Sequence, residues 1–244
     1  MTVHSIEKSR GSLRSYEHAR YNRVRRILRF LLRYIGFPLL AKVHQVEGQE
    51  NIPESGAAIL MINHNAFIDS ILVLHVTKRD IVPMAKIEVY DYPVLGIFPR
   101  LWGVIPVRRE EVDRRAIQQS LEVLRAGELV LVAPEGTRGP ALKQGKEGIA
   151  YLASRGGAPV IPVAVVGTTG FPALRFTGAW SGPGASVHFG HPFRFRSEYR
   201  HAGRDQLRLM TDEAMYVLSE MLPPDRRGYY SDLSRASHET IELV

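Results

Sequence analysis

Short apolar runs alternate along the chain with segments of helical periodicity. Runs rich in Val, Ile and Leu and bounded by Gly or Pro are typical of buried strands. We expect such strands at 43–47, 57–61, 81–85, 104–107, 129–133, 160–166 and 186–190. Helices are expected at 70–76, 110–126, 149–153 and from Asp205 to Met221, followed by a polar tail. This alternation predicts an α/β fold: a single domain with a mixed, largely parallel sheet flanked by helices, with Pro106 marking an edge strand.

A segment of helical periodicity from Asn22 to Ile35 precedes the first expected strand. One face is apolar: Val24, Ile27, Leu28, Leu31, Leu32 and Ile35. The other is polar: Asn22, Arg25, Arg26, Arg29 and Arg33. Gly36, Phe37 and Pro38 are expected to break the helix. Such a helix can lie on an anionic membrane surface, or it can pack its apolar stripe on the domain. Nucleic-acid binding is less favoured, because no stacking platform or known module accompanies the arginines.

Positive charge is concentrated in the same segment. The 244 residues carry a net charge of +7. Residues 1–44 hold ten Lys and Arg against two Glu, a net +8, which leaves −1 for the remainder. We therefore expect a basic amphipathic membrane-surface segment over 1–42 and an α/β domain over 43–244. The absence of cysteine excludes thiol nucleophiles, disulfides and Cys-ligated metals. No secretory signal or bilayer-spanning apolar run is recognisable.

The first candidate chemistry follows the expected strand at 57–61. His64 lies in the turn between this strand and the next helix, where open α/β sheets place functional groups, and Asp69 lies near the start of that helix. A carboxylate that orients an imidazole produces a general base able to take a proton from a hydroxyl. The alternative is an ordinary solvated or core histidine next to an aspartate that caps the helix.

Further expected strands also end in polar groups, namely Lys86, Arg108, and Glu135 with Arg138. If the strands share one sheet, these groups converge with His64 on one rim, where guanidinium and ammonium groups suit a phosphate-bearing substrate. Gly136 would allow a close backbone approach to the anion, and Thr137 would add a hydroxyl. Taken singly, each charge can equally be solvated or locally paired.

Five blocks of sequence occur in a fixed order over about residues 45–170. They are Asn63–Asp69, in which a His and an Asp are separated by four residues, then Ala85–Glu88, Gly103–Arg108, Pro134–Arg138 and Val160–Ala164. In this order the blocks resemble the motifs of the glycerolipid acyltransferases, the family typified by the bacterial enzymes that acylate 1-acylglycerol-3-phosphate.

That resemblance implies a reaction and roles for the residues. An acyl group would pass from acyl-CoA or acyl-carrier protein to the free hydroxyl of a lysophospholipid, most favourably 1-acylglycerol-3-phosphate, giving phosphatidic acid. His64 would deprotonate the hydroxyl and Asp69 would orient His64, without an acyl-enzyme. The sequence agrees, since it has neither a cysteine nor a Gly-x-Ser-x-Gly elbow. The residues implied to bind the substrate phosphate are Lys86, Arg108, Glu135, Gly136, Thr137 and Arg138.

The resemblance also implies a location and partners. The enzyme would be a peripheral or monotopic protein on the cytoplasmic face of the cell membrane. The residues expected to bind the membrane are Arg25, Arg29, Arg33, Leu28, Leu31 and Ile35. The expected partners are an anionic membrane surface, the lysophospholipid and the acyl donor, and no nucleic acid, cofactor or metal is expected. Two alternatives stay open: an acyltransferase for another lyso-lipid or a glycolipid, and a non-enzymatic basic protein that binds lipid surfaces or nucleic acid.

Overall fold

The structure is a computed structural model that describes residues 16–93, 95–108 and 113–244. In this part of the chain one sheet runs in the order β1-β7-β6-β2-β5-β3-β4, with β8 paired to β6 and β9 paired to β8. The strands are β1 Val43–Glu47, β2 Ala58–Ile62, β3 Ile81–Lys86, β4 Ile105–Val107, β5 Leu129–Val132, β6 Val160–Val166, β7 Ala185–Phe189, β8 Phe193–Phe195 and β9 Ile241–Leu243. The helices are α1 Asn22–Leu31, α2 Phe37–Leu40, α3 Ile68–Val76, α4 Ile97–Trp102, α5 Arg114–Arg125, α6 Gly148–Gly156 and α7 Arg204–Glu220.

The centre of the sheet is parallel and buried. Strand β2 pairs in parallel with β5 and β6, and β3 pairs in parallel with β5 and β4, whereas β6 and β7 are antiparallel. All five residues of β2 are buried, as are all four of β5, which is typical of strands covered on both faces. The mixed, mostly parallel α/β sheet expected from the sequence is confirmed, and Pro106 lies on the edge strand β4.

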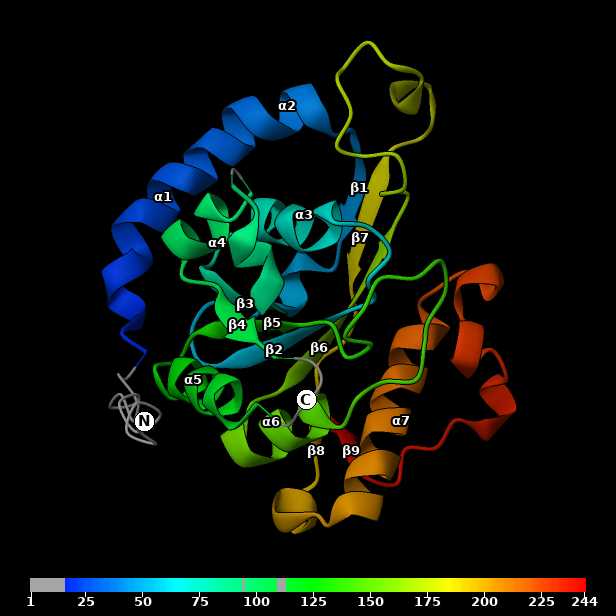
Figure 1. Ribbon diagram of the computed structural model, residues 1–244. Helices are drawn as coiled ribbons and strands as arrows, with labels where there is room; N and C mark the ends of the chain where they lie inside the picture. Colours follow the sequence, from blue (N-terminus) through cyan, green and yellow to red (C-terminus); the bar gives the residue numbers. More distant parts are fainter. Residues whose placement is uncertain (1–15, 94, 109–112) are drawn as a thin grey trace, which may run out of the picture.

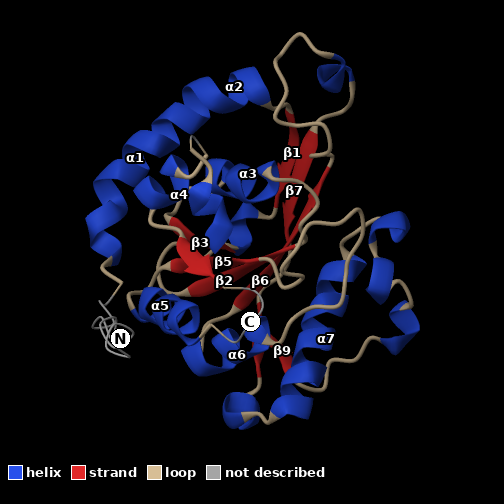
Figure 2. Cartoon of the chain, in the orientation of Figure 1, coloured by secondary structure: helices blue, strands red, loops and turns tan. Residues whose placement is uncertain are grey.

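Helices cover both faces of this sheet (Figures 1 and 2). Because side chains alternate across a strand, Ile59 and Met61 of β2 pack into one apolar core with α5, α6 and α7, while Leu60 and Ile62 pack into another with α3 and α4. Parallel strands align their carboxyl ends, so the turns after β2 and β5 meet at one edge of the sheet between the two layers.

The helix at the start of the described chain is longer than the sequence predicts. A π-helical turn at Leu32–Gly36 joins α1 to α2, so Gly36 does not break the helix and Pro38 sits in the first turn of α2. Pro38 has no N–H to donate to the preceding turn, and it directly follows the π-helical turn, where the hydrogen-bond pattern of the helix changes. Together α1 and α2 arch over α3 and α4 (Figure 1). The part of the expected 1–42 segment before Tyr16 lies outside the described residues.

The outer face of this helix exposes many apolar side chains, together with Arg23, Arg26 and Arg33. Its exposed apolar side chains are Ile27, Phe30, Leu31, Tyr34, Ile35, Leu39 and Leu40. The loop after β6 adjoins the end of α2, since the backbone N–H of Ala173 donates to the carbonyl of Leu40 at 2.8 Å. That loop carries two more exposed apolar side chains, Leu174 and Phe176. Among the described helices, none combines the length and the hydropathy needed to cross a bilayer.

The end of the chain differs from the polar tail that the sequence predicts. Ile241–Leu243 forms β9 on the edge of β8, and Phe193–Phe195 forms β8, neither of which was expected. Tyr230 is fully buried, and its hydroxyl donates to Asp212 Oδ1 at 2.7 Å and accepts from the Gly145 N–H at 3.1 Å. The segment after α7 therefore packs on the domain.

Candidate active site

His64 follows β2 at the carboxyl edge of the sheet and contacts Asp69 at the start of α3. The Nδ1 atom of His64 lies 3.2 Å from Oδ2 of Asp69. The same oxygen accepts the backbone N–H groups of Asn65 at 2.6 Å and Ala66 at 2.7 Å. Asp69 is completely buried, while 14% of the His64 side chain is exposed. The Asp69 carboxylate thus stabilises the turn through these hydrogen bonds and holds Nδ1 of His64 toward the buried side. Nε2 is therefore the ring nitrogen that a substrate can reach.

The turn after β5 forms hydrogen bonds with both the backbone N–H and the backbone carbonyl of His64. Oε1 of Glu135 accepts the His64 N–H at 3.0 Å, and the Gly139 N–H donates to the His64 carbonyl at 2.9 Å. Oε2 of Glu135 accepts the Lys143 N–H at 2.9 Å. Burial raises the pKa of Glu135, and the hydrogen bonds from Lys143 and His64 oppose that rise. From the sequence Glu135 is expected among the phosphate contacts, but both of its carboxylate oxygens accept hydrogen bonds from backbone N–H groups.

Asn63 and Asn65 fasten the same turn to β6. The side chain of Asn63 donates to the Val165 carbonyl at 2.8 Å and accepts the Val165 N–H at 2.7 Å, which mimics a pair of strand hydrogen bonds. Asn65 donates to the same carbonyl at 3.1 Å. Neither residue was expected from the sequence to be part of the site. The available signal was an amide side chain on each side of His64, directly after a buried strand.

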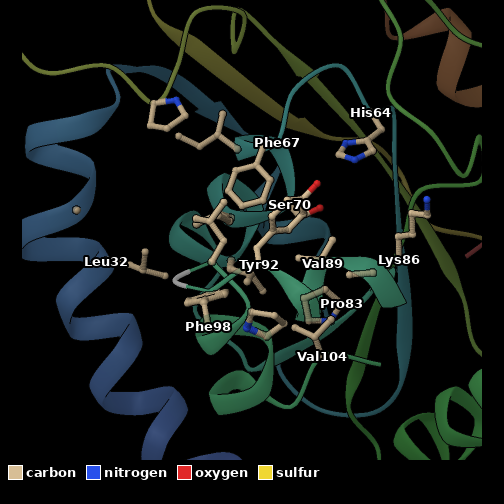
Figure 3. Close-up of a pocket in the computed structure, with 18 of the residues that line it drawn as sticks. Leu32, His64, Phe67, Ser70, Pro83, Lys86, Val89, Tyr92, Phe98 and Val104 are labelled. Carbon is tan, nitrogen blue, oxygen red and sulfur yellow. The ribbon is translucent and has the colours of Figure 1, made fainter. Parts of the chain in front are cut away.

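Two cavities meet at His64. The first, of about 510 Å³, lies beneath the arch of α1 and α2 and is lined by apolar side chains that include Leu32, Phe37, Ile71, Val89 and Phe98. Figure 3 shows Leu32 at one side of this cavity and His64 with Lys86 at the other. The second, of about 1020 Å³, lies against α5 and α6 and is lined by Ile117, Leu121, Ile149, Leu152 and Leu207, among others. His64, Ser70, Met84 and Ala85 line both cavities.

Most of the residues expected to bind phosphate at this rim are distributed between the two cavities. Lys86 and Arg138 line the first cavity, and Arg108 and Gly136 line the second. Lys86 also forms an ion pair with Glu88 at 2.8 Å. Thr137 is exposed and lines neither cavity.

Lys146 is a further cation at this edge of the sheet that was not expected from the sequence. It lines the second cavity, and its side chain lies against Gly136, whose φ of +66° is one that glycine adopts without strain. The lysine lies three residues after Lys143 in the segment 143–148, which the sequence pattern indicates only as the segment before a helix.

Some of the residues expected to bind a membrane are exposed, whereas others contact the domain. Arg25 is completely buried: its Nε donates to the Trp102 carbonyl at 2.7 Å and its Nη2 to the Tyr16 hydroxyl at 2.8 Å. Arg29 bonds to Asp80 and to the Lys78 carbonyl. A membrane role for Arg25 therefore does not fit the structure, because the domain supplies the partners of its guanidinium. Leu28 packs partly into the core, while the exposed residues of the expected set are Leu31, Arg33 and Ile35.

Comparisons with known proteins show which family the chain resembles. Residues 43–166 match the model of a protein family described as Acyltransferase. The chain is 31% identical over 130 residues to a 1-acyl-sn-glycerol-3-phosphate acyltransferase of Borreliella burgdorferi, a match that covers 52% of each protein. It is 30% identical over 124 residues to the enzyme of the same name from Bacillus subtilis, covering 50% of this chain and 62% of the relative. The matched region thus spans little more than half the length of these relatives.

The fold is shared with a solved structure. The crystal structure of the 1-acyl-sn-glycerophosphate (LPA) acyltransferase PlsC from Thermotoga maritima aligns with a TM-score of 0.57 at 23% sequence identity, covering 81% of this chain and 80% of that one. The match to the family model includes β1 to β6 and with them His64, Asp69, Glu135 and Arg138. The chain therefore belongs to the acyltransferase family.

Proposed function

We propose that this protein transfers a fatty acyl group from acyl-CoA or acyl-carrier protein to the free hydroxyl of a lysophospholipid, with 1-acylglycerol-3-phosphate as the favoured acceptor and phosphatidic acid as the product. The observation that carries the proposal is the contact of His64 Nδ1 with the buried carboxylate of Asp69 at the meeting point of two cavities. The names of the relatives from Borreliella burgdorferi and Bacillus subtilis support this choice of acceptor.

In the proposed reaction His64 acts as the general base. Its Nε2 takes the proton of the acceptor hydroxyl while the hydroxyl oxygen attacks the thioester carbonyl. The C–S bond then breaks, and the imidazolium returns the proton to the leaving thiolate, so no covalent enzyme intermediate forms. Asp69 holds the tautomer that carries hydrogen on Nδ1 and stabilises the imidazolium. Because Asn65 and Ala66 donate to the same carboxylate oxygen, the base is held in position before substrate binds.

The acceptor phosphate is proposed to lie beside Lys86 and Arg138. Both side chains line the cavity that contains His64, and a guanidinium with an ammonium group suits a phosphate ester. Glu135 is proposed to act indirectly: it positions the backbone of His64 by accepting a hydrogen bond from the His64 N–H. This arrangement would align the acceptor hydroxyl with Nε2.

The arch of α1 and α2 is proposed to dock on the cytoplasmic face of an anionic membrane. Its outer surface presents Phe30, Leu31 and Tyr34 to solvent, and Arg33 adds positive charge there. The first cavity lies directly beneath this arch, so the proposed membrane contact would bring the cavity that contains His64 close to the bilayer. Within the described chain, residues 16–42 would be the membrane-facing part and the rest the α/β domain.

An acceptor screen with the purified protein tests the proposal. Release of thiol from palmitoyl-CoA is measured alone and with lysophosphatidic acid, other lysophospholipids and glycolipids. We expect release to depend on lysophosphatidic acid and to be abolished by His64→Ala, while the variant still binds anionic liposomes. Near wild-type turnover by His64→Ala would refute the base assignment, and thiol release driven best by another acceptor would refute the substrate.

A further inference from the structure

The second cavity lies across the sheet edge from the first and has a different character. Its walls come from α5 and α6, and it runs beside α5 from Arg114 at one end of the helix to Arg125 at the other. Those two residues are eleven positions apart, which is about 16 Å along a helix axis. The cavity is therefore elongated, with an apolar wall that includes Leu121 and Leu152, and it is larger than the first.

The rim of the second cavity carries a net positive charge. Arg108, Arg114, Arg125 and Lys146 line the cavity together with two carboxylates, Asp113 and Glu147, and Arg114 and Arg125 are exposed on α5. The first cavity is covered instead by the arch of α1 and α2, which exposes a stripe of apolar side chains with Arg23, Arg26 and Arg33 beside it. One route to His64 thus suits a reactant that arrives from lipid, and the other suits a reactant that arrives from water and carries phosphate.

Acyl transfer to a lysolipid brings together two such reactants. The lysolipid resides in the membrane, whereas the acyl donor presents its thioester on a phosphopantetheine arm, whose phosphate lies at the far end from the sulfur. We propose that the second cavity binds this phosphopantetheine arm, with its phosphate at the cationic rim and its sulfur beside His64. The inference rests on the proposed function and adds the site at which the donor enters. The arm is common to coenzyme A and to acyl-carrier protein.

The absence of cysteine from the chain permits a direct test. Leu121→Cys places the only thiol in the second cavity, and Val89→Cys places it in the first; both positions are half-buried. Alkylation of each variant by iodoacetamide is followed by mass spectrometry with and without desulfo-coenzyme A, which carries the arm but no thiol and no acyl chain. At ten times its Kd, a ligand leaves about one-eleventh of the sites open, so labelling at the occupied cavity slows about tenfold.

We expect desulfo-coenzyme A to slow labelling of Leu121→Cys and to leave Val89→Cys unchanged. Protection of Val89→Cys, or protection of neither variant, would overturn the proposal. Protection of Leu121→Cys by lysophosphatidic acid without donor would also overturn it, because the cavity would then belong to the acceptor. Gln118→Cys, an exposed position that lines the same cavity, provides the test if Leu121→Cys does not fold.

Two further measurements complete the test. One identifies which donor supplies the phosphopantetheine arm, and the other distinguishes a failure of the donor site from a failure of the proposed function. Protection by 4′-phosphopantetheine alone shows that the shared arm suffices, and comparison of desulfo-coenzyme A with palmitoyl-carrier protein shows which carrier adds affinity. Transfer to lysophosphatidic acid is measured on the same samples. Transfer without protection refutes the donor site and leaves the proposed function standing. Protection without transfer to any acceptor refutes the proposed function while the binding site stands.

Discussion

The carboxylate of Glu135 accepts the backbone N–H of His64 at 3.0 Å, although 71 residues separate the two in the chain. The second oxygen of Glu135 accepts the Lys143 N–H, and Gly139 donates to the His64 carbonyl. The turn after β5 therefore sets the position of the histidine main chain, while Asp69 sets the orientation of its ring. Backbone and side chain of the proposed base are held by different elements of the fold.

Replacement of Glu135 by glutamine tests this positioning role. The amide oxygen can accept one N–H, but the amide nitrogen would face the other donor, so one buried hydrogen bond to a charged group is lost. We expect the free energy of unfolding to fall by about 1–3 kcal/mol. We also expect kcat to fall while the KM for the lysolipid stays close to that of the wild type.

Steady-state kinetics and thermal unfolding of Glu135→Gln check this expectation, with the exposed Glu198→Gln as the matched control. A raised KM with unchanged kcat would contradict it, because that pattern indicates direct contact with the acceptor.

Asp69→Asn tests whether the negative charge of Asp69 is needed in addition to the hydrogen bonds that hold the turn around His64. The asparagine oxygen can still accept the N–H groups of Asn65 and Ala66, so the turn should fold. The negative charge that stabilises the imidazolium is lost, and the amide favours the wrong imidazole tautomer. We expect kcat to fall by about 10²–10⁴-fold, with circular dichroism and the melting temperature close to wild type. A loss of less than about fivefold would leave Asp69 as a helix-capping residue without a part in the reaction.

The sequence predicts much of the fold because the pattern that defines a buried strand is local. All seven expected strands occur, and the turns after β2 and β5 meet because parallel strands align their carboxyl ends. That alignment also explains why His64, Lys86 and Arg138 could be predicted to share one rim. The strand Ile241–Leu243 was missed because a run of three residues carries too little periodicity to distinguish it from a tail.

The orientation of α1 could not be predicted in the same way. Helical periodicity places Arg25 and Arg29 on a polar face, yet both point to the domain, because Trp102 and Asp80 supply the acceptors. Those partners lie 77 and 51 residues away in the chain. Periodicity reports which positions share a face, but the direction of that face depends on partners that only the tertiary structure brings together.

Arg25 is accordingly expected to act on stability and not on membrane binding. Arg25→Gln cannot reach both the Trp102 carbonyl and the Tyr16 hydroxyl, so at least one buried acceptor loses its donor. We expect a loss of about 2–3 kcal/mol, or about 5–10 °C in melting temperature for a chain of this size. Differential scanning calorimetry checks the value. Arg26→Gln, at an exposed position of the same helix, is the control and should melt within about 1 °C of the wild type.

Arg33 is exposed and is expected to act on membrane binding. Arg33→Glu changes the charge at the arch by two, and each basic residue near an anionic surface contributes about 1 kcal/mol. We expect partitioning onto phosphatidylserine vesicles to weaken about 10–30-fold at low salt, with little change on neutral vesicles. Co-sedimentation measures the effect, and Arg194→Glu on the distant strand β8 is the matched control (Figure 1). Equal losses for both variants would place the membrane contact elsewhere on the molecule.

Acidification is expected to weaken the packing of the helical arch on the domain. Burial, together with the nearby Arg25 and opposed by Asp80, lowers the pKa of His18 from 6.5 to about 4. Nη1 of Arg25 lies 3.0 Å from Nδ1 of His18, and Glu128 lies 3.4 Å from Nε2. Burial likewise lowers the pKa of His75, which stacks on Phe37 of α2, to about 4. Both imidazoles are therefore neutral in the folded protein at pH 7.

The sign of the pH dependence follows from these directions. Between about pH 4 and pH 6.5 the unfolded chain binds more protons at these histidines than the folded chain does, so stability rises with pH across that range. The contribution is complete above pH 6.5 and is lost as the pH falls toward 4. For the nearly buried His18, a fall of the pKa from 6.5 to about 4 corresponds to about 3 kcal/mol. Urea unfolding at pH 7.5, 6, 5 and 4.5 should show this decline, and His18→Gln, which keeps an acceptor for Arg25 but does not titrate, should flatten it. An unchanged slope in His18→Gln would show that other groups govern the acid sensitivity.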